Sequence, residues 1–275
     1  MPRRIWMLVL LSMLLYIPSG YTQSAPAQPV YIAVTFYKVK PGKAEAYTSL
    51  VKTNAHKIVE GQFREKNILG WYFYEVIMPA GDQAPYDYVS VITSRNFGDL
   101  VDNPVTMKEM YAKTFAGSSP QQFQQYSNQL NDYRSVVKRE IYLHRAGINE
   151  KTPVSRYVEI DYMKPFPGKA EEYVRMERDV YYPIHLERMK LGALTDWGLY
   201  QRLLPYSETA ESDFVTANFF NNPRSIIDPK YEEAFNNMPN NVDFIRLSSQ
   251  IDQTRKLVRS DVWKLVDFID ANNTK

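Results

Sequence analysis

The chain has 275 residues, of which 44% are hydrophobic and 23% charged, so its composition is that of a globular protein and excludes extended disorder. Its 33 Lys and Arg residues against 31 Asp and Glu residues give a net charge of +2, which argues against a dedicated nucleic-acid binder. The chain contains no cysteine, and this excludes disulfides, thiolate catalysis and cysteine-ligated metal centres.

The first 27 residues have the pattern of a secretory signal peptide. Two arginines precede an apolar run from Ile5 to Ile17, and Ala25-Pro26-Ala27 fits a cleavage site of small residues. The apolar run is too short to span a bilayer, which takes about 20 residues. We therefore predict a signal peptide over residues 1–27. The mature protein is expected to be secreted or periplasmic, soluble, and not bound to a membrane.

The rest of the chain contains an internal repeat. Residues 31–96 align with residues 157–222 without a gap. The shared motif of the first copy runs from Lys38 through Pro41-Gly42-Lys43 to Tyr47, and a tryptophan recurs further on, as Trp71 and Trp197. We predict two domains, over residues 28–150 and 151–275, each made by one copy.

Both copies contain the same succession of predicted elements. Strands are recognised by β-branched and aromatic residues, and helices by apolar residues at helical spacing. The first copy gives, in chain order, a strand at Tyr31–Val39, a helix at Lys43–Glu65, strands at Trp71–Met78 and Tyr86–Thr93, a helical stretch from Ser119, and a strand at Glu140–His144. The second copy gives a strand at Tyr157–Met163, a helix at Lys169–Lys190, strands at Trp197–Leu204 and Asp213–Phe220, a helical stretch from Asp228, and a strand at Asp261–Val266. The order predicts an α+β fold, with two tandem ferredoxin-like β-α-β-β-α-β units packed sheet to sheet as an intrachain α/β barrel.

The order of elements and the strand–Lys-x-x-Pro-Gly-Lys-x-x-x-Tyr–helix entry at Lys38–Tyr47 resemble the dimeric α/β-barrel superfamily, in particular its NIPSNAP-like and antibiotic-biosynthesis-monooxygenase-like members. The resemblance implies a fold that hosts cofactor-free monooxygenases, haem-degrading enzymes and chlorite dismutase-like proteins. Haem enzymes of the superfamily carry a histidine on the second helix of a unit. Residues 100–137 and 226–258 contain no histidine, so we expect no cofactor.

The two copies differ along one stripe. Positions that are small or apolar in the first copy are polar in the second, namely Glu177, Tyr181 and His185 on the first helix and Glu159 and Asp161 on the first strand. The i, i+2 spacing of the two strand carboxylates directs both to one sheet face. Such a cluster can perform acid–base chemistry or hold a hard divalent cation. We take His185, Glu177 and Tyr181 as candidate catalytic residues, and Trp197, Glu159, Asp161 and Trp71 as candidate ligand-binding residues, and assign no metal site.

Two arginines recur ahead of the last strand of each copy. Arg134 precedes Glu140, and Arg255 precedes Asp261, late in the predicted second helices. We predict that each arginine forms a structural ion pair with the acidic residue that follows it.

Three functions remain open. The first is an exported protein that binds a small apolar or aromatic molecule between the sheet and the helices of the second copy, since apolar pockets with few polar groups are the usual ligand sites. The second is a cofactor-independent monooxygenase-like or other small-molecule enzyme, with Glu177 or His185 as its base. The third is a non-catalytic structural module, in which the polar stripe forms ordinary ion pairs and the tryptophans are core residues. A self-contained barrel predicts a monomer or weak homodimer.

Overall fold

The strands form one closed barrel with helices packed on its outside. The computed structural model describes residues 28–81, 83–102, 105–147, 154–238 and 244–271. The strands are β1 (Tyr31–Val39), β2 (Gly70–Met78), β3 (Tyr88–Ser94), β4 (Arg134–Gly147), β5 (Tyr157–Pro165), β6 (Asp196–Leu204), β7 (Phe214–Phe220) and β8 (Arg255–Ile269). They follow one another around the barrel in the order β1-β3-β2-β8-β5-β7-β6-β4, and every neighbouring pair is antiparallel.

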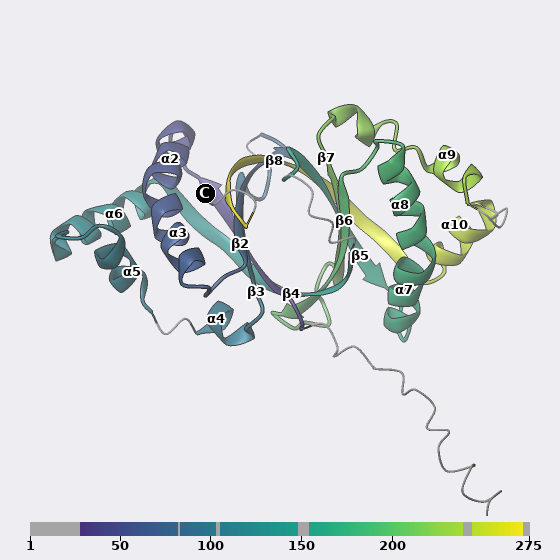
Figure 1. Ribbon diagram of the computed structural model, residues 1–275, viewed down its shortest axis with the longest axis horizontal. Coiled ribbons are helices and arrows are strands. Elements are labelled where there is room, and N and C mark those ends of the chain that lie inside the picture. Colours follow the sequence, from purple (N-terminus) through teal and green to yellow (C-terminus); the bar gives the residue numbers. More distant parts are fainter. Residues whose placement is uncertain (1–27, 82, 103–104, 148–153, 239–243, 272–275) are drawn as a thin grey trace, which may run out of the picture.

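The helices cover the barrel in two layers on opposite sides (Figure 1). The first layer contains α2 (Ala44–Leu50), the π-helical turn η2 (Val51–Ala55), α3 (His56–Arg64), α4 (Phe97–Val101), α5 (Met107–Thr114) and α6 (Pro120–Tyr133). The second contains α7 (Ala170–Met176), the π-helical turn η3 (Glu177–Tyr181), α8 (Tyr182–Lys190), the 3₁₀ turn η4 (Pro223–Ile226), α9 (Tyr231–Asn236) and α10 (Phe244–Asp252). Within the described ranges, none of the helices has the length and apolar character of a membrane-spanning segment.

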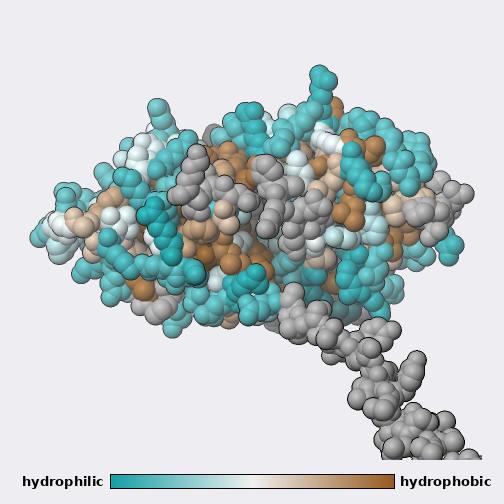
Figure 2. Space-filling model, viewed as in Figure 1, coloured by the Kyte–Doolittle hydropathy of each residue, from teal (hydrophilic) through white to brown (hydrophobic). Residues whose placement is uncertain are grey.

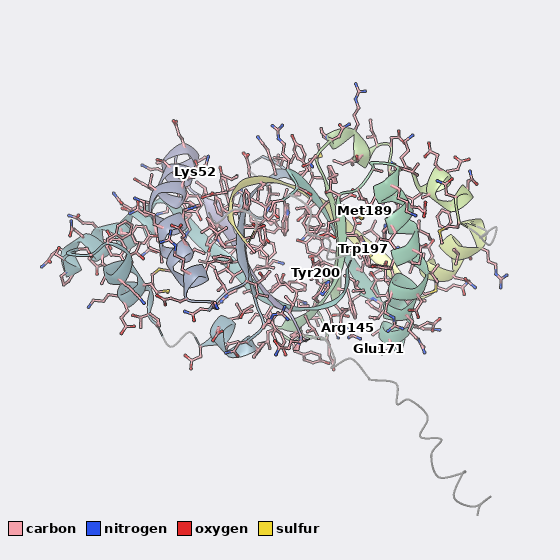
Figure 3. The ribbon with its side chains drawn as sticks, viewed as in Figure 1. Lys52, Arg145, Glu171, Met189, Trp197 and Tyr200 are labelled. Atoms are coloured by element: carbon pink, nitrogen blue, oxygen red, sulfur yellow. The ribbon has the colours of Figure 1, made fainter. Side chains whose placement is uncertain are left out.

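Alternation along each strand builds two separate apolar layers, because successive side chains point to opposite faces. On β1, Ile32, Val34 and Phe36 belong to the cluster inside the barrel, whereas Ala33 packs outside with Leu100 of α4. The same rule on β6 places Tyr200 inside the barrel and Trp197 under the second helical layer (Figure 3). The residues inside the barrel therefore come from the strands and from the segments next to them, such as Tyr86 before β3, and each helical layer has its own core.

The predicted elements are present, with two differences in detail. Each long first helix is interrupted by a π-helical turn, at Val51–Ala55 and at Glu177–Tyr181. In the second half Pro183 follows this turn, and a proline cannot donate the backbone hydrogen bond that an α-helix needs there. The last strands, β4 and β8, begin six residues earlier than Glu140 and Asp261, at Arg134 and Arg255. The α+β class with its large antiparallel sheet is confirmed.

Candidate functional site

Most of the predicted site residues lie together in the second helical layer. Glu177 begins the π-helical turn and Tyr181 ends it, and His185 follows on α8. Glu159 and Asp161 lie on the face of β5 that points away from the barrel interior, beside Asn218 and Thr216 of β7. We call these five predicted residues the second-layer cluster. π-helical turns occur often at functional sites, because they redirect side chains inside a regular helix.

His185 is a neutral ring held from two sides. Its side chain is 2% exposed, and it stacks on Trp197 with ring centroids 4.7 Å apart. Arg188 Nη1 lies 3.1 Å from His185 Nδ1 and donates to it, since a guanidinium has no acceptor. Burial, and then the charge of Arg188, lower the pKa of His185 well below its usual value. His185 is therefore poorly suited to accept a proton at neutral pH.

The carboxylates of the cluster act on one another. The pKa of Glu177 is raised to about 7, mainly by burial and with a smaller contribution from nearby Asp161, while Tyr173 and Arg255 act in the opposite direction. Burial also raises the pKa of Glu159 to about 7, again with a contribution from Asp161. Asp161 itself accepts hydrogen bonds from Ser260, from Asn218 Nδ2 at 3.1 Å and from Thr216 at 3.4 Å. Glu177 and Glu159, rather than His185, are the groups of this layer that titrate near neutral pH.

The arrangement does not fit a metal or haem in this layer. Among the described residues, no group of three or more His, Asp and Glu side chains could hold a metal ion. An axial haem ligand needs a free lone pair on a ring nitrogen. Because Arg188 donates to Nδ1 of His185, the remaining proton of the neutral ring lies on Nε2, and no lone pair is free.

Trp71 lies far from this cluster in the fold. It belongs to the core of the first helical layer, where Trp71 Nε1 donates to Ser90 Oγ at 2.9 Å. Trp197 is its counterpart in the second layer, on the other side of the barrel. Both rings are buried core residues, at 3% and 2% exposure, so the two tryptophans predicted as ligand-binding residues do not form one site.

A cavity of about 320 Å³ lies between the sheet and the helices of the first half. Its lining includes Val51, Ala55 and Val59, the residues that correspond to Glu177, Tyr181 and His185 in the second half. Small side chains leave space in the first layer at the positions where larger polar side chains occupy the second. The sequence analysis predicted a ligand site in the second layer. The smaller side chains at the equivalent positions of the first layer explain why an open cavity lies there.

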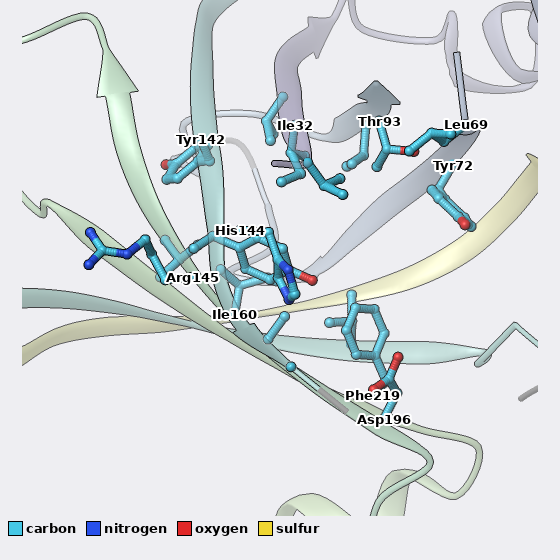
Figure 4. Close-up of a pocket in the computed structure, with 18 of the residues that line it drawn as sticks. Ile32, Leu69, Tyr72, Thr93, Tyr142, His144, Arg145, Ile160, Asp196 and Phe219 are labelled. Atoms are coloured by element: carbon cyan, nitrogen blue, oxygen red, sulfur yellow. The ribbon is translucent and has the colours of Figure 1, made fainter. Parts of the chain in front are cut away.

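The larger cavity is the interior of the barrel, with a volume of about 950 Å³. We call it the barrel cavity; Figure 4 shows a close-up. Its wall is formed by inward-facing apolar and aromatic side chains, among them Ile32, Val91, Ile160, Phe219, Tyr72, Tyr74, Tyr200 and Trp263. Polar residues line the part where β1 and β5 begin, including Arg95, His144 and Asp196. Hydrophobic side chains also gather over the barrel on the face shown in Figure 2.

Below the barrel cavity, a buried polar network fills the other end of the barrel. Asp261 is 0% exposed and accepts a hydrogen bond from Tyr86 at 2.5 Å, and it also pairs with Arg259. In the other half Glu140 pairs with Lys138 at 3.1 Å. The predicted ion pairs of Arg134 and Arg255 with these acids are wrong. Residues two positions apart on a strand point to the same face, so Lys138 faces inward with Glu140, and Arg259 faces inward with Asp261. Arg255 instead pairs with Asp252 on α10.

Sequence reasoning missed the residues of the barrel cavity. The signal was present as the alternation Tyr72, Tyr74 on β2 and as Tyr200 at the position equivalent to Tyr74. Alternation predicts a buried face, but it does not tell whether two facing sheets close together or leave space between them. The curvature of the closed sheet decides that question.

Comparison of the sequence with protein-family models and with curated protein sequences gives no match. Solved structures do resemble the fold. A "putative monooxygenase" from Lactobacillus acidophilus matches with a TM-score of 0.51 and 10% identity, over 88% of this chain and 96% of that chain. A heme-binding protein from Thermus thermophilus matches with a TM-score of 0.50 and 10% identity, over 87% of this chain and 92% of that chain. A "putative chlorite dismutase" matches at 0.44 and 15% identity, over 87% and 95% of the two chains. At such identities the likeness concerns the fold, and the chain shares the ferredoxin-like α+β architecture of the first two structures.

Proposed function

We propose that the protein binds a small apolar or aromatic molecule in the barrel cavity. The observation that carries this proposal is a cavity of about 950 Å³ lined mainly by apolar and aromatic side chains. Ligand sites of proteins have volumes of roughly 300–1,000 Å³ and the same kind of lining, with a few polar groups that orient the ligand. The heme-binding and monooxygenase neighbours support a role in which a small molecule is bound.

Filling the barrel cavity should abolish binding. Val91 lines the cavity, so in the Val91→Trp variant an indole occupies the space of the ligand. We expect the neutral fluorophore N-phenyl-1-naphthylamine to bind the wild-type protein with one site and to lose at least tenfold in affinity in this variant. Val136→Trp makes the same replacement at an exposed position of β4 and should bind like the wild type. Equal binding by both variants, with native circular dichroism, would place the ligand elsewhere.

A second candidate is small-molecule enzyme activity in the second helical layer, as a cofactor-independent monooxygenase or a related enzyme. Glu177 supports it, because a buried carboxyl with a pKa of about 7 can exchange protons at neutral pH. Two buried polar atoms close to the cluster, Asn218 Oδ1 and Arg255 Nε, have no hydrogen-bond partner among the described residues. Unpaired buried polar atoms are rare and often mark functional sites. On this proposal Glu177 is the base, His185 and Trp197 position the substrate ring, and Tyr181, Glu159 and Asp161 line the site.

A double replacement in the second-layer cluster distinguishes the two candidate functions. The double replacement Glu177→Gln with His185→Ala removes the base and its neighbour but leaves the barrel cavity intact. Loss of turnover with unchanged binding of N-phenyl-1-naphthylamine would support an enzyme site in the second layer. Unchanged turnover of an identified substrate would overturn it.

Three further proposals rest on the sequence, and they concern the origin of the two halves, export and oligomeric state. We propose that the two halves arose by tandem duplication of a NIPSNAP-like or monooxygenase-like unit, since the element order and the Pro-Gly-Lys turns recur. We also propose that residues 1–27 are a signal peptide removed on export, and that the mature protein is a monomer or weak homodimer. The N-terminal sequence of the secreted protein should begin at Gln28.

A further inference from the structure

The polar groups inside the barrel cavity narrow the class of ligand, on the premise that the cavity is the binding site. Five tyrosines line its wall. For three of them, Tyr72, Tyr74 and Tyr200, the hydroxyl group forms no hydrogen bond with another described residue, although phenol hydroxyls in protein interiors usually find a partner. Other tyrosines of the barrel interior follow that rule, since Tyr142 donates to Glu140 and Tyr86 to Asp261.

A buried tryptophan lies next to these tyrosines. Trp263 is 4% exposed and lines the same cavity, and its ring packs against Tyr74 with ring centroids 5.9 Å apart. Its Nε1 atom is enclosed by protein, so Trp263 contributes an aromatic wall to the cavity and no donor to a ligand.

The sequence also makes room for these groups. Gly198 stands two residues before Tyr200 on the same inward face of β6. A Cβ atom on Gly198 would lie 2.5 Å from the hydroxyl oxygen of Tyr200 and 2.7 Å from its ring carbon Cζ. The phenol of Tyr200 therefore rests against bare backbone, and glycine is required at position 198 for Tyr200 to adopt this orientation.

The phenol donors are neutral, and the lining of the whole cavity carries two basic residues, Arg95 and Arg145, against two acidic ones, Asp196 and Asp270. Burial is the main cause that raises the pKa of Tyr72 to about 12, and it also raises the pKa values of Tyr74 and Tyr200, so all three phenols keep their protons. Asp196 contributes to the raised pKa values of both Tyr72 and Tyr200, which places a negative charge near them. A charged carboxylate moved from water to neutral donors beside this aspartate would lose more hydration energy than it regains.

We propose that the barrel cavity takes a neutral, planar aromatic molecule with a carbonyl oxygen, whose two lone pairs accept hydrogen bonds from two of the phenols of Tyr72, Tyr74 and Tyr200. The aromatic walls fit the rings, and the unpaired donors fit an oxygen that has lone pairs and no proton. Tyr74 is the central donor, because it adjoins Trp263 and interacts electrostatically with both other tyrosines.

The test uses three probes of the same shape in equilibrium dialysis. Fluorenone carries the carbonyl group, fluorene lacks it, and fluorene-9-carboxylate is anionic. We expect fluorenone to bind wild-type protein about tenfold more tightly than fluorene, the factor that about 1.4 kcal/mol of hydrogen bonding gives. The carboxylate should bind more weakly than fluorene. In the triple variant with Tyr72→Phe, Tyr74→Phe and Tyr200→Phe, fluorenone should fall to the affinity of fluorene, whose own affinity stays unchanged.

Tyr88→Phe is the matched control, because Tyr88 is a buried tyrosine of the first helical layer, outside the cavity, and should leave all three affinities unchanged. The replaced hydroxyls have no protein partner among the described residues, so we expect the triple variant to keep the melting temperature of the wild type. Equal affinity of the wild type for fluorenone and fluorene overturns the ligand class and leaves the cavity as a binding site. A preference for fluorenone that survives in the triple variant overturns the donor assignment. Failure of all probes, together with failure of N-phenyl-1-naphthylamine, overturns the proposed function itself.

Discussion

Asp261→Ala should lower the free energy of unfolding by about 3 kcal/mol. Asp261 is fully buried at the end of the barrel and accepts hydrogen bonds from Tyr86 and Arg259. Alanine leaves the Tyr86 hydroxyl without its acceptor and the guanidinium of Arg259 without its buried partner. Breaking a buried charge pair costs roughly 3–5 kcal/mol, and the lower figure applies because Arg259 keeps a contact with Glu211 at 3.0 Å. Urea unfolding at pH 7 measures the change.

The equivalent acid of the other half provides a control. Glu140→Ala removes the partner of Lys138, whose side chain is 34% exposed and can regain water, and the acceptor of the buried Tyr142 hydroxyl. We expect a smaller loss for this variant, about 2 kcal/mol, because no buried charge is left unpaired. If Asp261→Ala costs no more than Glu140→Ala, the pairing of Arg259 with Asp261 adds nothing to stability beyond a buried hydrogen bond.

Glu177→Gln should stabilise the protein at pH 8 by up to about 3 kcal/mol and have little effect at pH 4. Burial raises the pKa of Glu177 from 4.5 to about 7 in the folded protein. Below pH 4.5 both the folded and the unfolded chain hold this proton. Between pH 4.5 and pH 7 the unfolded chain loses the proton first, so the free energy of unfolding falls as the pH rises. Above pH 7 the loss is complete and stays constant.

Glutamine has the shape of the protonated acid and does not titrate, so the variant should lose this part of the pH dependence. Urea unfolding between pH 4 and pH 8 measures it, and the change should lie in that pH interval. Glu232→Gln, on the exposed side of α9, serves as the control and should follow the wild type. A curve for Glu177→Gln parallel to the wild type would show that Glu177 is ionised in the folded protein at neutral pH, and would remove the base from the second candidate function.

The secondary structure was largely predictable, because the periodicity of apolar residues reflects local burial. Tyr31–Val39 was predicted and found with the same bounds, and the long first helices were predicted within a few residues. The π-helical turns were not predicted, since they need one added residue per turn and leave no distinct periodicity over five residues. The sequence correctly located the polar stripe from Glu177 to His185 as a place where the two halves differ. The pKa values of these side chains could not be predicted, because they depend on Arg188 and on Asp161 of β5.

The sequence by itself determined which residues form strands and helices, the α+β class, and which positions differ between the halves. The tertiary structure alone decided where space remains. Small side chains at Val51 and Ala55 leave a cavity under the first helices, and the closed sheet holds Tyr72, Tyr74 and Tyr200 around a larger one. The physical reason is that periodicity follows from the direction of a side chain relative to its own backbone. A cavity and its donors depend on the distance between strands far apart in the chain, which is fixed only when β2 pairs with β8 and β4 with β6.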